Sequence, residues 1–256
     1  MKGVILAGGK GTRLFPLTAV TNKHLVPVGN LPMIEYPLFT LKKMGIDDIS
    51  IVTGGEHFQS IAGYLANMHP EINFSYHYQQ KAGGIAQALL MAEPSSKNQK
   101  IAVILGDNLF EEDFYRSAQS FENEEAGTRL FLKAVENPQR FGVAEVEGYN
   151  IVSIEEKPKK PKSNLAVTGL YFYDEDVFDR IRTLKPSARG EIEITDVNNL
   201  YVEEKKAKYS VLNWFWSDAG TIESRKRCGD FVSKGLEDAV ISSFPEETRK
   251  LLPKKE

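Results

Sequence analysis

The polar residues with the most suggestive spacing follow the first apolar run of the chain, residues 4–7. They form a loop at residues 8–13 that reads Gly-Gly-Lys-Gly-Thr-Arg. Closely spaced glycines after a strand let backbone N–H groups approach phosphate oxygens, and Arg13 adds a planar guanidinium for the same oxygens. The loop matches neither the GxGxxG dinucleotide pattern nor the GxxxxGK[ST] P-loop. It predicts a polyphosphate site of another type, and the alternative is an ordinary glycine-rich turn with a surface arginine.

Two aspartates stand where a sheet would bring them near such a loop. Asp107 follows the apolar run 101–105, and Asp218 lies in a loop after a second strand-like segment. Paired carboxylates together with phosphate oxygens and water suit Mg²⁺. Taken singly, each aspartate is more typical of a turn or a helix N-cap than of a metal ligand. Lys23, taken by itself, is more typical of a solvated lysine than of a ligand.

The elements that must position these residues alternate along the first half of the chain. Apolar runs at residues 4–7, 49–52 and 101–105 each precede glycines, which is typical of buried parallel strands. Residues with helical spacing separate them, at 34–41, 58–65 and 85–89. This alternation predicts an α/β fold with a mostly parallel, Rossmann-like sheet wound by helices, whose ligand site lies beyond the carboxyl ends of the strands.

From residue 128 onward the pattern changes to strands without full helices between them. Strand-like segments are expected at 130–135, 142–147, 151–155, 165–173 and 209–216, with a hairpin over 143–154. Helices are expected around 177–184 and 197–200 and from about residue 221 to 235. We therefore predict one domain, residues 1–256, with a half at 1–127 and an inserted α+β half at 128–240. Little order is expected at its very end.

The composition excludes several classes of partner. The chain is 41% hydrophobic and 26% charged, as expected for a globular protein, and its 32 basic and 35 acidic residues give a net charge of -3. No global positive field therefore attracts nucleic acid or an anionic membrane. One cysteine, Cys228, cannot form an internal disulfide, and no signal peptide or membrane-spanning run is evident. A cytoplasmic location is expected.

Several sequence blocks, in order, are similar to those of the sugar-1-phosphate nucleotidylyltransferases, and specifically to the branch that uses dTTP and glucose 1-phosphate. The resemblance covers residues 1 to about 225. The blocks are Gly8–Thr18, Lys23–Val28, Pro32–Ile34, Gln79, Gly84–Ala88, Gly106–Asn108, Glu155–Pro158, Pro161–Asn164, Val167–Tyr171, Arg189–Asp196 and Trp216–Thr221.

The resemblance implies a nucleotidyltransferase fold of the GT-A-like type and a specific reaction. A phosphate oxygen of the sugar 1-phosphate attacks the α-phosphorus of the nucleotide and expels pyrophosphate. The nucleophile is already anionic, so no general base is needed, and positioning and charge neutralisation supply the catalysis. Mg²⁺ is the implied cofactor, held by Asp107 and Asp218.

The resemblance also assigns roles residue by residue. Arg13, Lys23 and Lys157 are implied to be catalytic. The implied nucleotide-binding residues are Gly8, Gly9, Gly11, Thr12, Arg13, Gln79, Gly84 and Asp107. The implied sugar-phosphate-binding residues are Gly142, Glu156, Lys157, Val167, Tyr171 and Arg189. Taken without the resemblance, Gln79 is more typical of a polar strand end, and Lys157 of a solvated, charged loop.

Three alternatives remain at this stage. The substrate nucleotide could be UTP, which would make the chain a uridylyltransferase, or the chain could be a nucleotide-sugar sensor without turnover. A dehydrogenase is disfavoured because the GxGxxG pattern is absent. Longer forms of the family continue well past the last block, with additional helices that help to build a second nucleotide-sugar site. In this chain only residues 221–256 remain there. We therefore expect no remote feedback site, and a monomer or a simple homo-oligomer.

Overall fold

A computed structural model describes residues 1–55, 58–125 and 127–252 of the chain. Its main feature is a nine-stranded sheet with the order β10-β9-β11-β6-β1-β4-β5, in which β8 pairs with β11 and β12. The strands are β1 (Lys2–Ala7), β2 (Pro27–Val28), β3 (Leu31–Pro32), β4 (Asp48–Thr53), β5 (Asn73–Tyr78), β6 (Ile101–Leu105), β7 (Asn108–Phe110), β8 (Thr128–Ala134), β9 (Gly142–Glu147), β10 (Asn150–Glu156), β11 (Leu165–Tyr173), β12 (Ala207–Val211) and β13 (Trp216–Asp218).

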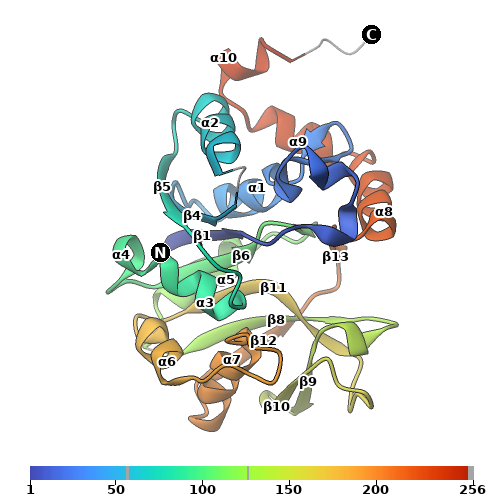
Figure 1. Cartoon of the computed structure of the whole chain (residues 1–256). Coiled ribbons are helices and arrows are strands. Elements are labelled where there is room, and N and C mark those ends of the chain that lie inside the picture. Colours follow the sequence, from blue (N-terminus) through green and yellow to red (C-terminus); the bar gives the residue numbers. More distant parts are fainter. Residues whose placement is uncertain (56–57, 126, 253–256) are drawn as a thin grey trace.

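Helices cover both faces of this sheet. Figure 1 shows α1 and α2 on one side of β1 and β4, and α3, α6 and α7 on the other. The α-helices are α1 (Glu35–Lys43), α2 (Phe58–Met68), α3 (Ile85–Met91), α4 (Glu93–Ser96), α5 (Tyr115–Glu122), α6 (Val177–Thr183), α7 (Ile194–Glu203), α8 (Ile222–Val232), α9 (Leu236–Ser242) and α10 (Glu246–Arg249). Short 3₁₀ turns are η1 (Thr12–Leu14), η2 (Leu17–Ala19), η3 (Lys23–Leu25) and η4 (Pro138–Arg140). None of the described helices is long and apolar enough to cross a bilayer.

Strand β1 is buried on both sides, as its unbroken apolar sequence predicts. Ile5 and Ala7 belong to one core cluster, with residues of α1, α2 and α5. Val4 and Leu6 belong to another, with residues of α3, α6 and α7. Because successive side chains of a strand point to opposite faces, a continuous apolar run requires a cover on each face.

The parallel core predicted from the first half is confirmed. β1 pairs in parallel with both β4 and β6, and β4 pairs in parallel with β5. The carboxyl ends of these four strands therefore meet at one edge of the sheet. The segments that leave this edge begin at Gly8, Gly54, Gln79 and Gly106.

The second half extends the same sheet instead of forming a separate layer. β11 pairs antiparallel with β6 and with β8, and the predicted hairpin is confirmed as β9 and β10. The prediction of one strand-like segment at 209–216 is wrong, because this part of the chain divides into β12 and β13. Lys133 Nζ contacts the carbonyl oxygens of residues 212–214 at 2.7–3.2 Å, and the chain there leaves β8 to pair with β7.

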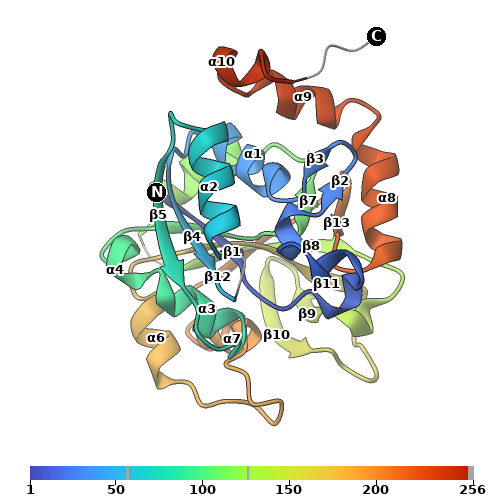
Figure 2. The same cartoon turned by 45° about the horizontal axis from the view of Figure 1, so that its top comes forward.

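The C-terminal helices form a third core cluster on the flank of the sheet. Figure 2 shows α8 beside β2 and β13, and buried side chains of α8 and α9 pack with residues of α1 and the β2–β3 hairpin. The start of α8 is fixed by a capping box, in which Thr221 and Ser224 each accept a hydrogen bond from the other's backbone N–H. This cap holds the segment that immediately follows Asp218. The very end of the chain, for which little order is expected, includes residues 253–256, which lie outside the described residues.

Candidate active site

The glycine-rich loop after β1 turns back toward Lys23. Gly9 and Gly11 have φ angles of +95° and +63°, a region that glycine enters without steric cost. A Cβ on Gly11 would lie 3.0 Å from the Cβ of Lys23, and Thr18 Oγ1 donates a 3.0 Å hydrogen bond to the Gly11 carbonyl. Gly11 therefore shapes the loop, and neither it nor Thr12 lines either of the two cavities described below.

An open cavity of about 370 Å³ lies at the carboxyl ends of β1 and β6. Its wall contains most of the residues that the sequence predicts to bind nucleotide: Gly8, Gly9, Arg13, Gln79, Gly84 and Asp107, together with Lys23. These residues are far apart in the chain, and the parallel strand order brings them to one place.

Gln79 lines this cavity together with Gly8 and Gly84, two of the glycines predicted to bind nucleotide. Gln79 is buried, and its Nε2 donates a 2.7 Å hydrogen bond to Gln87 Oε1. Its own Oε1 lies 2.5 Å from the position that a Cβ on Gly8 would occupy. Gly84 has a φ of +101° and packs against the backbone of Ile192. The missing side chain at Gly8 therefore leaves the Gln79 amide oxygen accessible from the cavity. Gln87 was not predicted as a site residue, although it lies in the block Gly84–Ala88.

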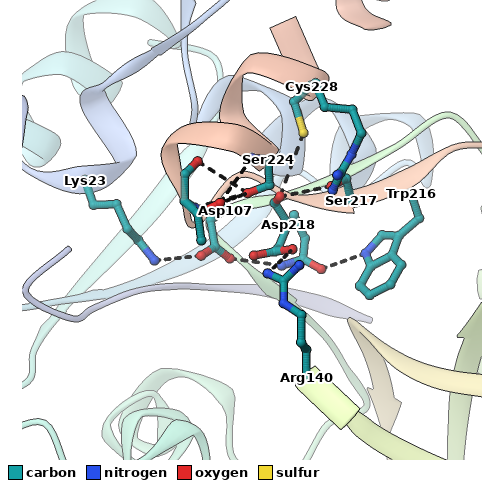
Figure 3. A network of polar contacts seen from close by, with 11 residues as sticks. Lys23, Asp107, Arg140, Trp216, Ser217, Asp218, Ser224 and Cys228 are labelled. Atoms are coloured by element: carbon teal, nitrogen blue, oxygen red, sulfur yellow. Dashed lines mark hydrogen bonds and ion pairs between the residues drawn. The ribbon is translucent and has the colours of Figure 1, made fainter. Parts of the chain in front are cut away.

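The two predicted metal ligands converge at Gly220. Asp107 follows β6, while Asp218 is the last residue of β13 and pairs with Asn108 of β7; the loop position predicted for Asp218 is wrong. A Cβ on Gly220 would lie 3.0 Å from Asp218 Oδ2 and 3.3 Å from Asp107 Oδ2. Only glycine leaves this space between the two carboxylates open, and Figure 3 shows the two side chains next to one another.

Lys23 forms an ion pair with one of these carboxylates, that of Asp107. Its Nζ is 2.7 Å from Asp107 Oδ2, and both side chains are less than 15% exposed (Figure 3). Burial alone would raise the pKa of Asp107, but the charges and hydrogen bonds around it, chiefly those of Lys23, hold that pKa far below its usual range. Burial and the Lys23 charge lower the pKa of His24 to about 3. Asp107 is therefore an anion at neutral pH and His24 is uncharged.

Two guanidinium groups complete the charge cluster. Arg13 Nη2 lies 3.3 Å from the position of a Gly220 Cβ. Arg140 Nη2 is 3.9 Å from Asp218 Oδ1 (Figure 3). Arg140 is the last residue of η4, two residues before β9 begins. It was not predicted as a site residue, and the available signal was its place two residues after Pro138, in the Asn-Pro pair that begins this turn.

A second open cavity, of about 210 Å³, adjoins the first. Its walls contain the predicted sugar-binding residues Gly142, Glu156, Lys157, Val167 and Tyr171, together with Asp107, Asp218 and Arg13. Arg13 and Asp107 thus line both cavities. Two ligands that filled the cavities would meet beside one carboxylate and one guanidinium.

Glu156 is held in the second cavity by three groups. Thr195 Oγ1 donates a 2.7 Å hydrogen bond to its Oε2, and Lys157 Nζ and Arg189 Nη2 each lie 3.3 Å from its Oε1. Arg189 contacts Glu193 more closely, at 2.7 Å, and is not among the residues that line the cavity. The structure therefore places Lys157 at the cavity wall and Arg189 behind Glu156.

A family model described as nucleotidyl transferase matches residues 2–234. The chain belongs to the nucleotidyl transferase family. Within this family it is 43% identical, over 237 residues, to a glucose-1-phosphate thymidylyltransferase of Neisseria meningitidis, an alignment that covers 91% of this chain and 82% of that protein. It is 41% identical to the glucose-1-phosphate thymidylyltransferase of Mycobacterium tuberculosis, with 96% and 88% of the two chains covered.

Solved structures agree with this family membership. A Bacillus anthracis protein assigned as a glucose-1-phosphate thymidylyltransferase, crystallised with sucrose, is 44% identical and superimposes with a TM-score of 0.86 over 100% of this chain and 98% of that one. A UDP-glucose pyrophosphorylase in complex with UDP-glucose is 26% identical, with a TM-score of 0.82 over 91% and 98% of the two chains. The nucleotidyltransferase fold expected from the sequence is confirmed.

Proposed function

We propose that the chain transfers a thymidylyl group from dTTP to glucose 1-phosphate, giving dTDP-glucose and pyrophosphate. The names of its relatives support these substrates. The observation that carries the proposal is that Arg13 and Asp107 belong to the walls of both cavities. A sugar phosphate and a nucleotide bound in the two cavities would bring the attacking oxygen to the α-phosphorus at that common wall.

The reaction is an in-line displacement. A phosphate oxygen of glucose 1-phosphate forms a bond to the α-phosphorus, the bond from that phosphorus to the bridging oxygen breaks, and pyrophosphate leaves with the electron pair. Arg13 and Lys23 are proposed to bind the triphosphate, and Lys157 the sugar phosphate. Their positive charges reduce the repulsion between the two anions, and Glu156 is proposed to accept hydrogen bonds from sugar hydroxyls.

The residues at Gly220 fit a divalent cation, which we propose to be Mg²⁺. Two carboxylates face a space that a single methyl group would fill, and hard oxygen ligands of this kind suit Mg²⁺. Asp107 and Asp218 would hold the ion, and when bound it would neutralise charge on the phosphate oxygens. We also propose that residues 1–127 bind nucleotide and residues 128–240 bind the sugar phosphate, since the two cavities divide largely in this way.

Lys157→Ala is expected to raise the KM for glucose 1-phosphate about tenfold with a smaller effect on the KM for dTTP. The lysine side chain is 49% exposed, so the loss should lie near the lower end of the ~1.5 to 3 kcal/mol of a charged hydrogen bond. Initial rates with each substrate varied in turn would measure the two KM values. Lys160→Ala, in the same loop but with an exposed side chain, is the control, and equal changes in both KM values would contradict the assignment.

Base selectivity is expected to separate pyrimidines from purines more sharply than thymine from uracil. Both pyrimidines offer the same N–H to Gln79 Oε1, and the thymine methyl group adds at most ~1 to 3 kcal/mol in such a pocket. We expect a moderate preference for dTTP over UTP and poor use of ATP and GTP, as measured by kcat/KM for each triphosphate with glucose 1-phosphate. Efficient turnover of a purine triphosphate would contradict the role assigned to Gln79.

Pyrophosphate release, measured over a matrix of nucleoside triphosphates and sugar 1-phosphates, tests the proposal as a whole. Fastest release with dTTP and glucose 1-phosphate supports it. Fastest release with UTP would instead support the uridylyltransferase alternative, which the 26% identity to a UDP-glucose pyrophosphorylase makes the weaker one. Binding of dTDP-glucose without release from any pair would support the sensor alternative.

A further inference from the structure

Asn108 lies at the point where three strands of the site meet. It is the first residue of β7, it is 2% exposed, and its backbone pairs with Asp218 of β13. Its side-chain Nδ2 donates a 2.9 Å hydrogen bond to Asp107 Oδ1, and its Oδ1 accepts hydrogen bonds from Trp216 Nε1 at 2.8 Å and from the Gly169 backbone N–H at 3.0 Å. One buried amide thus connects Asp107 with β11 and β13.

The chemistry of these neighbours allows the amide only one orientation. An indole N–H and a backbone N–H can only donate, and both face the same end of Asn108. The ionised carboxylate of Asp107 can only accept, and it faces the other end. If the amide were turned over, its NH₂ group would face two donors and its oxygen would face an anion. Trp216 and Gly169 therefore oblige Asn108 to donate to Asp107.

The two groups that donate hydrogen bonds to Asn108 Oδ1 are themselves fixed in place. Trp216 is 9% exposed, and its ring packs against Phe141 with the ring centroids 5.3 Å apart. A Cβ on Gly169 would collide with the Asn108 amide, so that only glycine lets the backbone N–H approach. Lys23 contacts Oδ2 of Asp107, and Asn108 contacts Oδ1, so both oxygens of this carboxylate are restrained.

From this geometry we infer that Asn108, oriented by the Trp216 indole, is a positioning residue that holds the Asp107 carboxylate facing Asp218. The inference rests on the proposed function, since it concerns the site assigned to the divalent ion. Groups that orient metal ligands in this way typically change metal affinity by about 10- to 100-fold when they are removed. Asn108 and Trp216 both belong to the wall of the second cavity, and neither lines the nucleotide cavity, so their effect on nucleotide binding without metal should be small.

The test measures binding of Mn²⁺ to the full chain by the electron paramagnetic resonance signal of the free ion, without substrates. Asn108→Ala is expected to weaken Mn²⁺ binding by about 10-fold or more, and Trp216→Phe, which keeps an aromatic ring but removes the N–H, by several-fold. Trp214→Phe is the matched control, because Trp214 is 58% exposed and has no contact with Asn108. The affinity for dTTP in EDTA should stay within about twofold of wild type in all three variants.

Trp216→Phe keeps the test decisive even if Asn108→Ala does not fold. Wild-type Mn²⁺ affinity in a folded Asn108→Ala chain, or in Trp216→Phe, would overturn the inference. So would an equal loss of Mn²⁺ and dTTP affinity, which would indicate a general loss of structure. A wild-type chain that binds no Mn²⁺ would overturn the proposed metal site together with this inference. Mn²⁺ binding that follows the expected order without any pyrophosphate release would leave the inference standing and contradict the proposed reaction.

Discussion

Asp107→Asn and Asp218→Asn are each expected to lower kcat by on the order of 10²-fold or more while the fold stays intact. The substitution keeps the shape of the side chain and removes its negative charge from the space at Gly220, where the two carboxylates converge. The variants differ in one respect. Asp107→Asn also removes the negative charge that forms the 2.7 Å ion pair with Lys23, whereas Asp218→Asn leaves that ion pair in place.

Initial rates of pyrophosphate release at saturating dTTP and glucose 1-phosphate, repeated over a range of Mg²⁺ concentrations, measure this loss. Circular dichroism and thermal unfolding of each variant report whether the fold persists. Asp230→Asn is a suitable control, because Asp230 is an exposed carboxylate on α8. Near wild-type kcat in both site variants would show that the assignment of these residues to metal is wrong.

The same two variants should lose the reverse reaction in equal proportion. Groups that stabilise a transition state do so whichever side it is approached from. The measurement is formation of dTTP from dTDP-glucose and pyrophosphate. A wild-type chain that is active forward and inactive in reverse with every nucleotide sugar tried would contradict the displacement mechanism.

Arg13→Ala is expected to lower kcat about 10²-fold, with a smaller change in the KM for glucose 1-phosphate. Negative charge on the departing pyrophosphate grows in the transition state, and a guanidinium placed there stabilises that state more than the bound substrate. The structure puts Arg13 in the wall of both cavities, close to the oxygens of Asp107 and Asp218. This is the position at which the α-phosphorus is proposed to react.

The kinetic comparison uses two further variants. Arg13→Lys keeps the charge but cannot bind two phosphate oxygens in one plane, and it should recover only part of the lost rate. Arg116→Ala removes an exposed arginine on α5 and should leave kcat unchanged. A purely raised KM for dTTP at wild-type kcat would contradict the role in the transition state and leave Arg13 as a binding residue only.

The local sequence was sufficient to predict the parallel strands at the core of this protein. Continuous apolar runs such as residues 4–7 and 101–105 have no polar face, so they require cover on both sides. Residues with helical spacing between them supply that cover. The glycines directly after the runs mark the edge where a ligand can approach the backbone, and this is where Gly8 and Asp107 lie. The helix at 115–122 and the short final helices were missed, because each buries few apolar side chains, such as Ala118 and Phe121 in the first of them, and depends on partners elsewhere in the fold.

What only the tertiary structure decided is how polar groups distant in sequence face one another. Trp214 and Trp216 cannot be distinguished by sequence pattern, yet one is 58% exposed and the other 9% exposed with its indole N–H on Asn108. Asn108 reads as a turn residue until its partners are known, which are Asp107 in the preceding turn, Gly169 of β11 and Trp216 of β13. The same holds for Gly220, whose missing side chain leaves room between two carboxylates. Residue types and periodicity determine which segments become strands and helices, whereas contacts across more than a hundred residues depend on the packed sheet that joins them.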